Sequence, residues 1–339
     1  MINKMLYNIF LSEQLRLKQY YSGFDERVVD TVAEVAHQQR SSSWEHMRNE
    51  LPDNTIFSTE NSSIEVLDIL PKDYDETWVY HLPMGNPLAD HMQLRVATLA
   101  AAKPDKRIIA IGNPSGPNQG VGKLPAASLR TVWSGNLRPT IDPVMRYLVS
   151  QQIERATHIG FSYGAEKAAA ASQYAEKYDQ HVPSGLFMEP VAIKQRGLLE
   201  LGRDFNSTAA ALEGYVKASA SGPVEEAGKR AAEKSHGLVG YGLGLLRMSN
   251  IAIAHALTKE GFENRVDAGL TSQSEMQAHL VWGTESELAT HGLMIELVGR
   301  LQAKFGVRRV STMEVVGQKH AMGDDVFLHT AMVLQNLNR

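Results

Sequence analysis

The sequence predicts an α/β fold in which helices cover both faces of a mostly parallel central sheet. Short apolar stretches typical of buried strands alternate with helical stretches, both before about residue 194 and after about residue 272. Between these two positions the chain has helical periodicity without an apolar strand. Alternating strands and helices are typical of a parallel sheet, and 339 residues suffice for one large domain that carries an insertion.

The first predicted strands form a hairpin at 55–70, because two β-rich stretches flank the turn residues Asn61, Ser62 and Ser63. Further apolar stretches of strand length follow along the chain. They are 77–83, 107–114, 157–162, 184–193, 278–283 and 307–316. The helices expected between and after these strands are 91–102, 144–155, 165–178, 287–305 and 324–337.

This pattern divides the chain into three parts. The predicted core is 55–193 together with 273–339, and the helical stretch 194–272 between them is predicted to be an inserted lid. Residues 1–54 form a predicted N-terminal helical extension, with apolar positions at roughly helical spacing between 9 and 39. Two roles stay open for this extension: packing on the outside of the core, or self-association into a homo-oligomer.

The composition is that of a globular protein, with 43% hydrophobic residues and a formal net charge of -4. A slightly acidic chain has no overall electrostatic attraction to nucleic acid or to an anionic membrane. Cysteine is absent, which excludes disulfides, thiolate metal sites and a cysteine nucleophile. The most apolar long stretch, 237–257, carries Arg247 at its middle, so no membrane span is predicted. Because the N-terminus shows no secretory signal pattern, we expect a cytoplasmic protein.

The stretch "GFSYG" places Ser162 between Gly160 and Gly164, directly after a predicted strand and before a predicted helix. In a nucleophile elbow, a strand runs into a helix through a tight turn, and small residues on either side let neighbouring backbone pass closely. The N-terminal amides of the following helix can then stabilise a developing oxyanion. The alternative is a glycine-rich loop whose serine has no catalytic role.

With this elbow, residues 55–339 resemble the α/β-hydrolase superfamily, in which a lid is often inserted at the place of 194–272. The resemblance implies a catalytic triad in the order serine, acid, histidine. His320 lies in the loop after the last predicted strand, and Gly317 stands where the family often has a glycine before the histidine. We therefore expect Ser162 as the nucleophile and His320 as its base.

The sequence offers three candidates for the acid of the triad. After the predicted strand 278–283, the family commonly has Asp at the position that Ser286 occupies here. Glu287 is our first choice for the acid, because "GTESEL" resembles a family variant in which the acid follows a serine, and Glu285 is the second. Glu189, after the preceding strand, is the third, because some members take their acid from there. Each could also be an ordinary loop carboxylate.

The resemblance also implies an oxyanion hole made of two main-chain amides. One is that of Tyr163, directly after the nucleophile, and the other is expected from the loop after the strand 77–83. Pro83 has no amide hydrogen, so Met84 is the candidate there. The same residues could also form a plain Pro/Gly turn.

The prediction is therefore a serine hydrolase that cleaves a carboxylic ester, or a related thioester, lactone, amide or carbon–carbon bond, through an acyl-enzyme on Ser162. Aliphatic residues of the lid, such as Leu198, Leu199 and Leu201, suggest a small-to-medium apolar acyl or ring substrate, although ordinary packing explains them as well. No nucleotide-binding motif or metal-ligand spacing stands out, so no cofactor is expected. The alternative is a catalytically inactive member of the fold that binds a ligand or partner.

Overall fold

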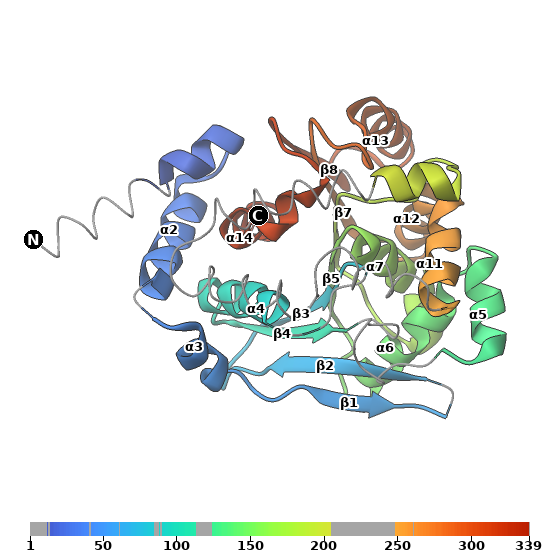
Figure 1. Cartoon of the computed structure of the whole chain (residues 1–339), viewed down its shortest axis with the longest axis horizontal. Coiled ribbons are helices and arrows are strands. Elements are labelled where there is room, and N and C mark those ends of the chain that lie inside the picture. Colours follow the sequence, from blue (N-terminus) through green and yellow to red (C-terminus); the bar gives the residue numbers. More distant parts are fainter. Residues whose placement is uncertain are drawn as a thin grey trace, which may run out of the picture.

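The computed structural model describes residues 12, 14–40, 42–60, 62–84, 88, 90–112, 124–204, 248–259 and 261–338. Within these ranges the strands form one eight-stranded sheet, and helices lie on both of its sides (Figure 1). The predicted α/β class with a mostly parallel sheet is confirmed.

The sheet is built from the strands predicted along the chain. They are β1 (Thr55–Ser58), β2 (Ser63–Ile69), β3 (Glu76–His81), β4 (Lys106–Ile111), β5 (Thr157–Phe161), β6 (Ser184–Met188), β7 (Gln277–Gly283) and β8 (Val310–Val315). Their order across the sheet is β1-β2-β4-β3-β5-β6-β7-β8. The pairs β1–β2 and β2–β4 are antiparallel, and all pairs from β4 to β8 are parallel. Strand β6 ends five residues earlier than the predicted 184–193, where the chain turns at Glu189.

Successive residues of the central strands enter two separate cores. Val79 and Ile109 pack into one core, whereas Trp78 and Ile108 pack into the other. This alternation follows from the two-residue period of a strand. Because all four side chains are fully buried, both faces of the sheet must be covered by helices.

The first core is covered by helices that follow β4 along the chain: α5 (Ala126–Trp133), α6 (Arg138–Ser150), α7 (Tyr163–Tyr174), α11 (Met248–Thr258), α12 (Phe262–Ser272) and α13 (His291–Phe305). The second core is covered by α2 (Glu26–Arg40), α3 (Trp44–Glu50), α4 (His91–Ala102) and α14 (Val326–Leu337). Figure 1 shows the two groups on opposite sides of the strands. Among the described helices, none is long and apolar enough to cross a membrane.

The described part of the N-terminal segment packs on the second core. Val29 and Val32 of α2 are fully buried, and α2 packs against α4 and α14. Burying side chains of this size contributes about 1.5–3 kcal/mol each. The helical spacing of apolar residues in this segment therefore reflects contact with the core.

Most of the predicted lid, 205–247, lies outside the described residues. In the described remainder, residues 198–204 are helical, with Leu199 exposed and Leu201 buried. Helix α12 packs along α7, in the layer that covers the sheet. The outer bounds of a lid thus stay a prediction.

The strand order changes direction beside β3. The chain runs from β3 to β4 on one side, and then returns to place β5 on the other side of β3. In open α/β sheets, ligands bind beyond the carboxyl ends of the strands at such a switch point. The carboxyl end of β5 is where Ser162 follows Phe161.

Candidate active site

Ser162 lies in a strained turn between β5 and α7. Its backbone has φ 57° and ψ −126°, a region that a non-glycine residue enters only when the surroundings force it there. Its amide donates to the carbonyl of Met188 at the end of β6, with 2.9 Å between N and O. Helix α7 begins at the next residue, so its first amides point toward the serine. This is the geometry of a nucleophile elbow.

The two glycines of the elbow are required by close backbone contacts. A Cβ atom on Gly160 would lie 2.0 Å from the carbonyl oxygen of Gly164, and one on Gly164 would lie 2.1 Å from the carbonyl oxygen of His81. Both distances are far shorter than any real contact of a Cβ atom. The turn can therefore close against α7 and β3 only when both positions lack a side chain.

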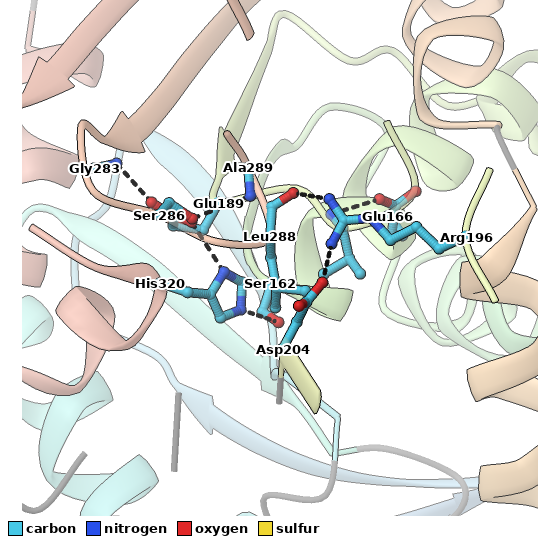
Figure 2. A network of polar contacts seen from close by, with 11 residues as sticks. Ser162, Glu166, Glu189, Arg196, Asp204, Gly283, Ser286, Leu288, Ala289 and His320 are labelled. Atoms are coloured by element: carbon cyan, nitrogen blue, oxygen red, sulfur yellow. Dashed lines mark hydrogen bonds and ion pairs between the residues drawn. The ribbon is translucent and has the colours of Figure 1, made fainter. Parts of the chain in front are cut away.

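His320, from the segment that follows β8, is in contact with Ser162. It opens a short 3₁₀ helix, η2 (His320–Asp324), which follows β8. Its Nε2 lies 2.9 Å from Ser162 Oγ, and its ring stacks on Phe161 with 5.5 Å between centroids. Both Ser162 and His320 are almost completely buried. The two residues that the sequence predicted as nucleophile and base are thus in hydrogen-bond contact (Figure 2).

Glu189, the third choice for the acid, is the carboxylate that reaches the histidine. Its Oε2 lies 2.9 Å from His320 Nδ1, and the residue is fully buried. The first choice, Glu287, is corrected here, because its carboxylate forms an ion pair with Lys319 instead, at 3.5 Å. The main chain of Glu285, the second choice, donates to the carbonyl of Gln318, and no contact between its side chain and His320 is found in the described residues.

The tautomer of the histidine follows from this contact. A carboxylate only accepts hydrogen bonds, so Nδ1 of His320 must carry the proton that it shares with Glu189. Nε2 is then unprotonated in the neutral ring, and it accepts from the hydroxyl of Ser162. This leaves His320 ready to take the proton of the serine.

The carboxylate of Glu189 is held by groups from the end of β7. Its Oε1 accepts from the amide of Gly283 at 2.6 Å, and its Oε2 also accepts from the hydroxyl of Ser286. The Ser286 oxygen in turn accepts from the amide of Ala289 at 3.0 Å. Ser286, which occupies the position where the resemblance implied an acid, therefore donates to a carboxylate at the end of the neighbouring strand. Figure 2 shows these groups converging on Glu189.

A buried ion pair holds the loop that carries Glu189. The carboxylate of Glu166, on α7, accepts from the amides of Val191 and Ala192 at 3.0 and 2.7 Å. Arg265 of α12 donates to the same carboxylate at 2.6 Å. Burial raises the pKa of Glu166, and the arginine and the two amides act against this. A buried carboxylate satisfied in this way fixes the start of the loop after β6.

Arg196 connects the next part of the loop after β6 to Asp204 and to the loop after β7. Its guanidinium donates to Asp204 at 2.8 Å and to the carbonyl of Leu288, which lies two residues after Ser286 (Figure 2). The side chain is fully buried. The loops after β6 and β7 are thus connected by a charged side chain as well as by Glu189.

The two predicted oxyanion-hole residues lie on different elements. Tyr163 is the first residue of α7, and Met84 lies in the turn after β3, three residues beyond His81, which packs on the elbow. Their amides remain candidates for the oxyanion hole. Within the described ranges, no group of His, Asp and Glu residues has the arrangement of a metal site.

A cluster of basic side chains lies buried under the elbow. Lys167 of α7 is fully buried, with its Nζ 6.0 Å from the centroid of the Tyr163 ring. His81 and His158 share a hydrogen bond of 2.9 Å between Nε2 and Nδ1. Burial lowers the pKa of Lys167 to about 7 and that of His158 to about 4. Their charged forms are therefore disfavoured in the folded protein.

Replacing Lys167 with Met will remove a pH dependence of stability. Between pH 7 and about 10.5, the unfolded chain binds a proton at Lys167 that the folded protein does not, so wild-type stability rises with pH there. The free energy of unfolding of Lys167→Met, relative to that of wild type, should therefore decrease by up to about 1.4 kcal/mol per pH unit across this range. Urea unfolding of both proteins at pH 7, 8 and 9 measures this, and a difference that stays constant with pH would contradict it.

The chain resembles known proteins by its structure and not by its sequence. No protein-family model matches the sequence. A search of curated proteins likewise gives no match. Solved structures do resemble the chain, and an esterase from Pyrococcus furiosus is one of them. It shares 13% sequence identity and a TM-score of 0.54, over 86% of this chain and 91% of that one.

Two further structures have similar scores. Naproxen esterase (carboxylesterase NP) from Bacillus subtilis shares 12% identity and a TM-score of 0.51, over 90% of this chain and 98% of its own. A loop variant of the haloalkane dehalogenase DbeA from Bradyrhizobium elkanii shares 14% identity and a TM-score of 0.54, over 84% and 95%. At these identities the likeness is one of fold, and it confirms the predicted α/β-hydrolase fold.

Proposed function

We propose that this chain, which has the α/β-hydrolase fold, is a serine hydrolase that cleaves a carboxylic ester. The observation that carries the proposal is the continuous hydrogen-bonded series from Ser162 through His320 to Glu189, at the carboxyl ends of parallel strands. A nucleophile, a base and an orienting acid in this order are the parts needed for acyl transfer to a serine. The strained backbone of Ser162 supports the same role.

In the first half of the reaction, Ser162 Oγ attacks the carbonyl carbon of the ester, and His320 Nε2 takes the hydroxyl proton. Glu189 stabilises the positive imidazole that forms and keeps its orientation. When the tetrahedral intermediate collapses, the bond to the alcohol oxygen breaks, and His320 returns the proton to that oxygen. The alcohol leaves, and the acyl group stays on Ser162.

In the second half, His320 takes a proton from a water molecule, which attacks the acyl carbon. The bond to Ser162 Oγ breaks, the serine recovers its proton from His320, and the carboxylic acid is released. In both halves a negative charge develops on the carbonyl oxygen. We assign its stabilisation to the amides of Tyr163 and Met84, each worth on the order of 3–4 kcal/mol in such sites.

The choice of ester rests on two supports. Two of the structures that resemble the chain are esterases by name. A serine oxygen next to a neutral histidine is also the form of nucleophile suited to an acyl carbon. An apolar acyl group stays the substrate class that the sequence of the predicted lid suggests.

Intact-mass labelling with a fluorophosphonate tests the proposal. The wild type should gain one adduct, and Ser162→Ala should gain none, because only a serine activated by His320 reacts at a useful rate. Turnover of p-nitrophenyl acetate and butyrate should fall by about 10³-fold or more in the same variant. Ser172→Ala is the matched control, since Ser172 lies on the same helix and its hydroxyl donates to the carbonyl of Ala168 within that helix.

An adduct that persists in Ser162→Ala would place the reactive group elsewhere. A folded wild-type protein that forms no adduct would contradict hydrolysis through Ser162, and would favour a protein that binds a ligand without turning it over.

A further inference from the structure

The segment that carries His320 is anchored at both of its ends by the N-terminal helical stretch. At the end of β8, the amide of Val316 donates to the carbonyl of Tyr20, with 3.0 Å between N and O. Beyond η2, the guanidinium of Arg16 makes two contacts with the carboxylate of Asp325, one of them 3.1 Å between Nη2 and Oδ1. Residues 14–20 are helical, so both anchors come from one rigid element.

The Arg16–Asp325 pair is a buried one. The side chain of Asp325 is fully buried and that of Arg16 is 19% exposed. Removing one partner of such a pair leaves an uncompensated charge in the interior. Asp325 also accepts from the amide of Leu328 and so caps the start of α14. Arg16 therefore holds the carboxylate that ends η2 and begins the next helix.

Little space is left for η2 to shift without moving the imidazole. Arg95 of α4 donates to Asp324, the residue before Asp325, at 2.7 Å. A Cβ on Gly323 would lie 2.6 Å from the ring of Phe161, the same ring on which His320 stacks. A displacement at Asp324 or Asp325 is thus transmitted to the histidine through close contacts.

We propose that Arg16 is a positioning residue for catalysis: through Asp325, the N-terminal helical stretch holds η2 so that His320 stays in contact with Ser162 and Glu189. Arg16 then has a positioning role in addition to the part that the N-terminal segment plays in covering the second core. This inference rests on the proposed hydrolase function, because it concerns the base of that reaction.

The Arg16→Met variant tests it. Misplacing a catalytic group by about 1 Å can cost about 100-fold in rate. We expect kcat for p-nitrophenyl butyrate and the rate of fluorophosphonate labelling to fall by at least about tenfold, with KM nearly unchanged. Arg16→Lys, which keeps the charge, should recover part of the loss. Asp325→Asn retains an acceptor for the helix cap but loses the charge, and it should lower kcat in the same way.

Lys18→Met is the matched control. Lys18 is on the same helical stretch, and its ion pair with Glu26 is exposed, so kcat should stay at the wild-type value. Thermal unfolding of every variant separates positioning from simple loss of stability. If Arg16→Met does not fold, Asp325→Asn decides the question.

The two ideas can fail separately. A folded wild type that forms no adduct contradicts the proposed function. A wild type that is labelled at Ser162, together with folded Arg16→Met or Asp325→Asn that reacts as fast, overturns the role of Arg16 alone.

Discussion

Glu189→Gln should lower kcat/KM for ester substrates by about 10⁴-fold while the protein remains folded. An amide in place of the carboxylate can donate to His320 Nδ1, which favours the tautomer with the proton on Nε2. That nitrogen then cannot accept the proton of Ser162. The variant also cannot stabilise the imidazolium that forms during attack. Steady-state turnover of p-nitrophenyl butyrate measures the loss.

Glu287→Gln is the matched control for this result, because Glu287 follows the neighbouring strand and pairs with Lys319. Its turnover should stay within about twofold of wild type, because a partly exposed ion pair of this kind contributes about 1 kcal/mol at most to stability. A large loss in Glu287→Gln, with little change in Glu189→Gln, would return the acid to the position that the sequence first suggested.

Gly160→Ala should destabilise the protein by about 3 kcal/mol or more. The added methyl group would lie 2.0 Å from the carbonyl oxygen of Gly164, which belongs to the first turn of α7. Neither β5 nor α7 can move away freely, because β5 is paired on both sides and α7 is buried between the sheet and α12. Urea unfolding followed by circular dichroism measures the change.

Gly299→Ala is the control for the effect of Gly160→Ala on stability. Gly299 lies within α13, and no atom within 4 Å would meet a Cβ there. The substitution should therefore stabilise the protein by about 0.5–1 kcal/mol, as expected for alanine in a helix interior. Equal effects at Gly160 and Gly299 would mean that the elbow does not depend on the contact between Gly160 and Gly164.

The serine and the histidine could be predicted because their signals are local. Gly160 reflects a close contact within the same turn, and Gly164 reflects the close approach of β3, but both are visible in the sequence as glycines on either side of Ser162. The order of strands and helices then leaves His320 in the loop after β8. The strand positions were predictable for the same reason, since their apolar residues serve two cores.

The carboxylate that contacts His320 was only the third choice from the sequence, because its position depends on which of two adjacent strand ends supplies it. The loops after β6 and β7 lie side by side, and each contains a glutamate. A signal was present in Ser286, which stands at the family's usual acid position and cannot serve as one. Its hydroxyl donates to Glu189 instead. The positive φ of Glu189 is visible only in three dimensions.

The position of Arg16 against Asp325 was not predictable from the sequence for a different reason. The spacing of apolar residues in 9–39 indicates a helix with one buried face, but not which surface it covers. Its partner is an aspartate in "GDD", a pattern equally typical of an exposed loop. The carboxylate of Asp325 is fully buried in the folded protein, and this burial is not visible in the sequence.

The contact between Arg16 and Asp325 joins positions 309 residues apart, and the contact between Ser162 and His320 joins positions 158 apart. A chain made from its N-terminus onward therefore synthesises the nucleophile long before the base. The apolar face of α2, with Val29 and Val32, packs on α4 and α14, and α14 is synthesised after α4. This face therefore lacks its contacts with α14 until the end of synthesis. Contacts of such sequence separation form slowly, and exposed apolar surface favours aggregation in the interval. On the proposed mechanism, the nascent chain therefore cannot form the Ser162–His320 contact until translation has passed His320, or the Arg16–Asp325 contact until it has passed Asp325.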